Sequence, residues 1–67
     1  MEEREKAKIQ ISRWIDHNAS HQEEYEKLAD QLEGMGEKKA AFNIRELAAY
    51  NQQEIEALRK ALAALER

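Results

Sequence analysis

The sequence contains no cysteine, no proline and only two glycines, and aromatic residues make up 6% of it. The lack of cysteine excludes disulfide bonds, thiolate metal ligands and a thiol nucleophile. Because proline interrupts helices, its absence leaves almost the whole chain free to form continuous helix. The two glycines, Gly34 and Gly36, lie close together, and they are the strongest signal for a break in the chain.

Long apolar runs and an excess of positive charge are also missing. No stretch is long enough for a signal peptide or a membrane span, so we expect a cytoplasmic protein without a membrane partner. The net charge of −3 argues against nucleic-acid binding, because neutralising a row of phosphates requires an excess of lysine and arginine. With 67 residues, the chain has room for one small domain, residues 1–67.

Apolar residues recur at helical spacing on both sides of the glycines. We predict a helix over about 2–33, a Gly-Met-Gly turn at 34–36 and a second helix over about 37–66. Gly34 is expected to be the left-handed residue that ends the first helix, and Gly36 the N-cap of the second. A connection this short makes consecutive helices antiparallel neighbours. The predicted fold class is therefore all-α, an antiparallel two-helix hairpin.

The apolar stripe of each helix is wider than one partner helix can cover. In particular, Trp14 is too large to be covered by one facing helix. We therefore predict that two hairpins associate into a four-helix bundle, a homodimer with the packing of a coiled coil. An apolar face left free in that dimer would instead favour a protein partner.

Polar interruptions of the two stripes are expected to meet at mid-height. With the turn centred on Met35, the numbers of facing residues sum to about 70, which places Asn18 opposite Asn51. We predict a polar core layer of Asn18, His21 and Asn51. In one interpretation this layer is structural, and it sets helix register and oligomeric state at some cost in stability.

The other interpretation is a metal site. His17 and His21 are four residues apart, so their rings lie on one helix face and can share a cation. Glu24, one turn beyond, is predicted to add an oxygen ligand. Glu54 on the second helix is predicted to be a fourth ligand or an outer partner. Imidazole with carboxylate suits divalent nickel, zinc or cobalt. The asparagines of the polar layer would then orient the imidazoles.

Catalysis is not expected from this sequence. His17, Ser20 and Glu24 share a helix face, but one exposed face supplies neither a substrate pocket nor an oxyanion hole. Trp14 and Tyr25 are interpreted as aromatic packing residues, each with a polar group that reaches a partner. We therefore predict a non-enzymatic module.

A pattern of the form W-x2-HN-x2-H-x3-Y is carried by Trp14, His17, Asn18, His21 and Tyr25. Together with the glycine turn and the helix rich in alanine and leucine, it resembles a small helical domain of unknown function from archaea and bacteria. The resemblance covers roughly residues 11–65. That domain is sometimes appended to small nickel-binding accessory proteins or encoded near cobalt and nickel uptake genes. The resemblance therefore implies a metal-related context. The predicted function is a non-enzymatic oligomeric module that binds a divalent metal through His17 and His21, and the alternative is a purely structural self-association or protein-interaction module.

Overall fold

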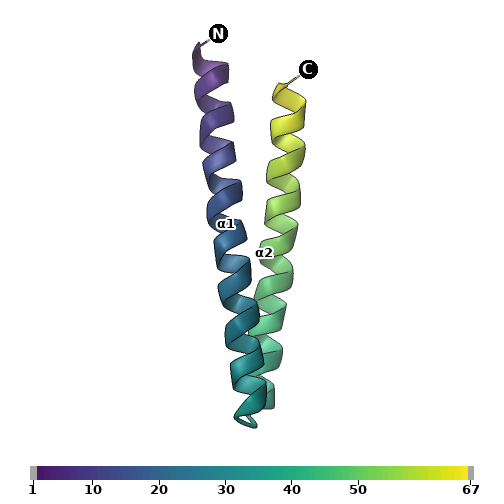
Figure 1. Ribbon diagram of the computed structural model, residues 1–67. Helices are drawn as coiled ribbons and strands as arrows, with labels where there is room; N and C mark the ends of the chain where they lie inside the picture. Colours follow the sequence, from purple (N-terminus) through teal and green to yellow (C-terminus); the bar gives the residue numbers. More distant parts are fainter. Residues whose placement is uncertain (1, 67) are drawn as a thin grey trace.

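A computed structural model describes residues 2–66, which form two helices and the turn between them. Helix α1 spans Glu2–Gly34 and helix α2 spans Lys38–Leu65. The helices lie side by side and antiparallel, so both termini lie at the same end of a rod 53 Å long (Figure 1). The predicted all-α hairpin is thus confirmed, whereas the four-helix bundle stays a prediction.

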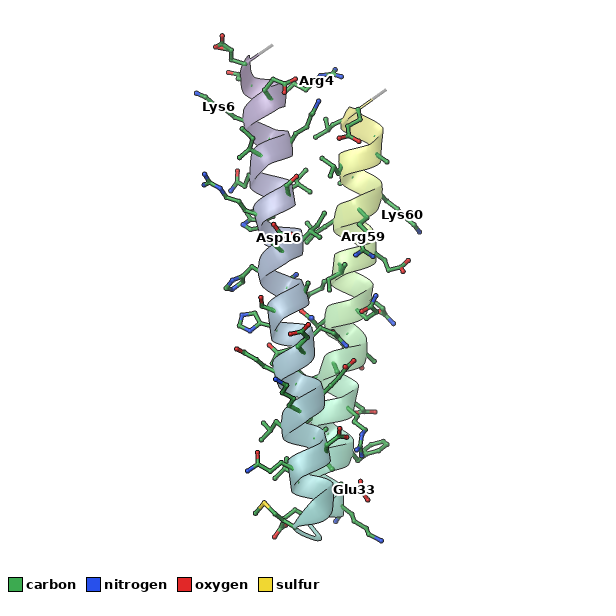
Figure 2. The ribbon with its side chains drawn as sticks, viewed as in Figure 1. Arg4, Lys6, Asp16, Glu33, Arg59 and Lys60 are labelled. Carbon is green, nitrogen blue, oxygen red and sulfur yellow. The ribbon has the colours of Figure 1, made fainter. Side chains whose placement is uncertain are left out.

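Charge at the open end of the hairpin supports both helix termini. Glu2, Glu3 and Glu5 occupy the first turn of α1, where the helix dipole favours negative charge. Nη1 of Arg4 donates a hydrogen bond of 3.2 Å to the main-chain carbonyl of Leu65. Figure 2 shows Arg4 at this end of α1, beside the end of α2. A cation therefore meets a carbonyl at the negative end of α2, and the hydrogen bond joins the two termini.

The turn is closed by a Schellman motif around Gly36. This glycine has a φ of +85°. Its N–H donates to the carbonyl of Glu33 at 3.0 Å, and the N–H of Glu37 donates to the carbonyl of Leu32 at 2.9 Å. These two bonds satisfy carbonyls that the end of α1 leaves free. The left-handed residue is therefore Gly36 rather than Gly34, which is still helical.

The start of α2 also differs from the expectation. Its N-cap is Glu37 rather than Gly36, and the Glu37 side chain makes no capping hydrogen bond. The physical reason is that Gly36 is already used to end α1, so the second helix begins one residue later than predicted. Both helix boundaries at the turn lie within one residue of the predicted ones.

The core is a narrow seam between the facing stripes of the two helices. Its buried residues are mostly small: Ala29, Ala41, Ala48, Asn51 and Ile55. No large side chain in residues 2–66 is fully buried. In the view of Figure 1, the ribbons overlap near the turn and draw apart toward the termini. The alanines lie in the half nearer the turn, and their small side chains permit this closer approach.

The assignment of the left-handed residue can be tested with two alanine variants. Gly36→Ala is expected to destabilise the protein by about 1–2 kcal/mol, because a Cβ is unfavourable in the left-handed region. No atom lies within 4 Å of the position that this Cβ would take, so the cost is conformational. Urea unfolding at one fixed protein concentration measures the change.

Gly34→Ala is the matched control. Gly34 also has open space around it, but it is helical, so alanine is expected to stabilise the protein by up to about 1 kcal/mol. Opposite signs for the two variants are the expected result. A loss of stability in Gly34→Ala equal to that in Gly36→Ala would contradict the placement of the left-handed residue.

Candidate functional site

Asn51 is a buried polar residue of α2, with 6% of its surface exposed. Its Nδ2 donates to the main-chain carbonyl of Asn18 and to Oε1 of Gln22, at 2.8 Å in both cases. Both hydrogens of the amide are therefore used, which offsets the cost of burying the group. The predicted meeting of Asn18 and Asn51 is observed, and it links the two helices near mid-height.

The polar layer contains Gln22 in place of the predicted His21. Both residues lie near the stripe of α1 that faces α2, but they differ by about 100° around the helix. The structure turns Gln22 toward α2 and leaves His21 on the edge, half-buried. A signal for this orientation is present in the sequence, since Gln22 lies between Ile15 and Ala29 at intervals of seven residues.

His21 instead contacts residues of its own helix. Its Nε2 lies 2.9 Å from Nε2 of His17, and the two rings are edge-to-face with centroids 4.3 Å apart. Its Nδ1 lies 3.4 Å from Oε1 of Glu24, and its ring is parallel to that of Tyr25 with centroids 5.7 Å apart. Residues of α1, rather than the asparagines of the polar layer, therefore orient this imidazole.

Both contacts of the His21 ring are within hydrogen-bond distance. A carboxylate only accepts, so in the contact with Glu24 the donor is Nδ1 of His21. Which of the two Nε2 atoms donates to the other depends on the tautomer of each ring. The two Nε2 atoms thus face each other across 2.9 Å.

The structure brings two of the four predicted metal ligands together. His17 and His21 meet through Nε2, whereas Glu24 approaches the opposite nitrogen of His21, which is the place of an outer partner. Glu54 lines a hollow beside Trp14. In the part of the chain that the structure describes, no group of three or more His, Cys, Asp or Glu residues is arranged to hold a metal ion. Metal binding by the four residues stays a prediction.

The hollow beside Trp14 marks an apolar side of the hairpin. It is open, has a volume of about 430 Å³, and is lined by Trp14, Asn18, Glu54, Ala57 and Leu58. At intervals of seven residues, Trp14 shares a ridge of α1 with His21 and Leu28, and Glu54 shares a ridge of α2 with Leu47. We call the side of the hairpin formed by these two ridges and Leu58 the Trp14 face.

Large apolar side chains on the Trp14 face are only partly covered. Trp14 is 50% exposed, Leu28 is 41% exposed and Leu47 is 42% exposed. The predicted packing role of Trp14 is therefore not completed within one hairpin. Tyr25 is half-buried and contacts the His21 ring.

The opposite side of the hairpin carries a cluster of three charged residues. Arg45 of α2 reaches across to two carboxylates of α1: Nη2 lies 3.1 Å from Oδ1 of Asp30, and Nη1 lies 2.8 Å from Oε1 of Glu33. The hydrogen bond to Glu33, followed by that to Asp30, raises the pKa of Arg45 above its ordinary value. Sequence reasoning missed this bridge, because the spacing of residues on different helices does not identify the partner.

Residues 7–65 match the model of a family described as a domain of unknown function, DUF8180. The chain belongs to this family. A domain of unknown function over most of the chain agrees with the resemblance seen in the sequence, but no link of DUF8180 to nickel or cobalt proteins is shown. Comparisons with curated proteins and with solved structures give no match. Within residues 2–66, neither helix of this DUF8180 domain contains a segment apolar and long enough to cross a membrane.

The polar layer of this DUF8180 domain can be tested with a double-mutant cycle. Asn51→Ala removes both hydrogen bonds and is expected to destabilise the protein by about 1–2 kcal/mol. Combined with Gln22→Ala, it should show a coupling of about 0.5–1.5 kcal/mol, because the two side chains share one bond. Gln52→Ala, at the exposed neighbouring position, is the control and should change stability by less than about 0.5 kcal/mol. Additive effects of Asn51→Ala and Gln22→Ala in urea unfolding would contradict the contact.

Proposed function

We propose that this DUF8180 domain is a non-enzymatic self-association module. Two hairpins pack their Trp14 faces together and form a homodimeric four-helix bundle. The observation that carries the proposal is the half-exposed Trp14, which lies beside the hollow and in line with the exposed Leu28. An indole of this size stabilises a protein through burial, and an exposed apolar patch of this kind marks an interaction surface.

The surface area of the hairpin supports a dimer. The chain exposes 5298 Å². A compact monomer of its mass, 7.8 kDa, exposes only about 4,400 Å². The excess is about 900 Å² per chain, or about 1,800 Å² for two chains, which is the area that a stable interface buries. A second copy is therefore an occupant of suitable size for the Trp14 face.

The small core of the hairpin also supports a dimer. Domains of fewer than about 80 residues rarely gain enough stability from one core, and they add disulfides, metals or oligomerisation. Disulfides are excluded here because the chain has no cysteine. The buried seam between α1 and α2 consists mainly of alanine, which contributes little apolar area. Packing against a second hairpin would supply the missing burial.

Charge determines which side of the hairpin is covered. The charges of the Arg45 bridge stay in water, so no desolvation cost arises as long as this side remains uncovered. On the Trp14 face, the ridge of Leu47 carries one carboxylate, Glu54, and the ridge of Trp14 carries an imidazole. The open hollow on this face does not enclose a substrate, which supports an interaction surface rather than an active site.

Sedimentation equilibrium of the tag-free protein tests the proposal. The wild type is expected to be dimeric at micromolar concentrations. Leu47→Glu places a charge on the Trp14 face at a position that is 42% exposed in the hairpin, so the hairpin itself should tolerate it. The dimer dissociation constant is expected to rise at least tenfold, because a buried unpaired charge opposes association.

Phe42→Glu is the matched control. Phe42 is 61% exposed and lies three residues before Arg45, on the charged side of α2. It should leave the dissociation constant within about threefold of the wild type, because rim and outer charges contribute little. A monomeric wild type, or equal effects of Leu47→Glu and Phe42→Glu, would contradict the proposed interface.

A second candidate function is divalent metal binding by His17 and His21. The distance between their Nε2 atoms, 2.9 Å, favours it. Two nitrogens that bind one ion at about 2.1 Å with an angle of 90° lie about 3.0 Å apart. A tetrahedral ion would separate them by about 3.3 Å or more. A small rotation of either ring spans both separations, so the pair is compatible with nickel, cobalt or zinc.

Calorimetric titration of nickel, and then zinc, into the tag-free protein tests this second function. Saturable binding of nickel in the micromolar range is expected, because two imidazole nitrogens on one helix face can bind the same ion. His21→Ala should abolish the binding, and Glu24→Gln should weaken it by about tenfold, the effect of losing an outer partner. No heat of binding in the wild type would exclude the site.

A further inference from the structure

The histidine pair offers only part of a coordination shell. Nε2 of His17 and Nε2 of His21 supply two ligand positions, and Glu24 contacts the far nitrogen of His21. Among the described residues, no third His, Cys, Asp or Glu joins the pair in a group that could hold an ion. Transition-metal ions in proteins bind four to six ligands. A tightly held ion therefore requires ligands from outside the hairpin.

The position of the pair along the rod shows where such ligands can come from. The midpoint of α1, which spans Glu2–Gly34, is Asn18, so His17 and His21 lie on either side of mid-height. His21 also belongs to the ridge of the Trp14 face, between Trp14 and Leu28. In an isologous interface, residues near the two-fold axis meet the same residues of the other copy.

We propose that a divalent transition-metal ion binds on the two-fold axis of the homodimer, held by His17 and His21 of both copies. The proposal rests on the self-association through the Trp14 face. The axis crosses the rod at mid-height, so α1 packs antiparallel against α1 of the second copy, and the two turns lie at opposite ends. The two Nε2 atoms of each copy occupy neighbouring corners of a square, and the two copies together supply the four imidazole nitrogens of a square plane around the ion.

The same arrangement covers the large apolar side chains. With the axis near Ala19, Trp14 of one copy falls between His21 and Leu28 of the second copy. The indole then fills the space beside the histidines, and water is excluded from the metal site. The carboxylate of Glu24 keeps its contact with Nδ1 of His21, so it orients the ring and makes its Nε2 a stronger ligand.

A metal ion shared by two chains should strengthen their association. Ligands from both copies bind the ion only in the dimer, so its binding free energy adds to dimer stability by mass action. The net charge of −3 on each chain opposes association, and a divalent cation between two chains reduces this repulsion. The ion is therefore a regulator of the oligomeric state in this arrangement.

Titration with nickel chloride, combined with sedimentation equilibrium, tests the shared site. We expect one nickel ion per two chains and a dimer dissociation constant at least tenfold lower with nickel than with chelator. The variant with both His17→Ala and His21→Ala should still dimerise, because its large apolar residues are intact, but its dissociation constant should be the same with nickel and with chelator. Glu56→Gln, at an exposed position of α2 outside the Trp14 face, is the matched control and should keep the stoichiometry and the response. Glu54→Gln tests whether α2 supplies a ligand, and the shared site predicts that it does not.

Each alternative outcome identifies the step that fails. One nickel ion per chain would overturn the shared site and leave a site within each hairpin. Loss of the nickel response in Glu54→Gln would also overturn it, because Glu54 of α2 would then be a ligand. In that case α1 would face α2 of the second copy, and the two turns would lie at the same end. A dimer with no response to nickel would overturn this inference alone, whereas a monomer under all conditions would overturn the self-association as well.

Discussion

Two helices that lie side by side can cover only one stripe of each other, and most features of this hairpin depend on that limit. The covered stripe is narrow, and its buried members are mainly alanines that let α1 and α2 approach closely. The larger apolar side chains are left at the edge, where Trp14 is half exposed. The burial that stabilises most small domains is therefore only partly achieved by one chain. This shortage of buried apolar area is the observation on which the proposed self-association rests.

The two sides of the hairpin differ in polarity. On one side, Arg45 joins the helices through Asp30 and Glu33, and all three charges stay in contact with water. On the other side, apolar residues dominate, and the polar groups gather near mid-height. A partner that covers the Trp14 face would bury apolar area without desolvating the Arg45 bridge. The asymmetry would give the proposed self-association a defined surface, which a uniformly apolar hairpin would lack.

The polar layer connects this surface to the histidine pair. Asn51 is buried, and its two hydrogen bonds to α1 favour one register between the helices. Because Asn18 accepts one of these bonds at the midpoint of α1, the imidazoles of its neighbours His17 and His21 are held at mid-height as well. The register within the hairpin and the position of the proposed shared site would therefore have a common origin.

The sequence by itself determined the two helices, their antiparallel order and the level at which their polar interruptions meet. The absence of proline and the pair of glycines leave little choice of fold, and a short turn sets which residues lie at the same height. Family membership as a domain of unknown function also follows from the sequence over residues 7–65. Whether the chain binds metal or a second copy is not contained in these features.

Only the tertiary structure decided which side of each helix faces the other. Neighbouring residues differ by about 100° around a helix, so a small rotation exchanges Gln22 for His21 in the polar layer. That rotation depends on how alanine and isoleucine side chains pack across the seam. The spacing of residues along one helix does not predict this packing. The left-handed conformation of Gly36 has a more local origin, because the hydrogen bonds of the Schellman motif join only the end of α1 and the turn.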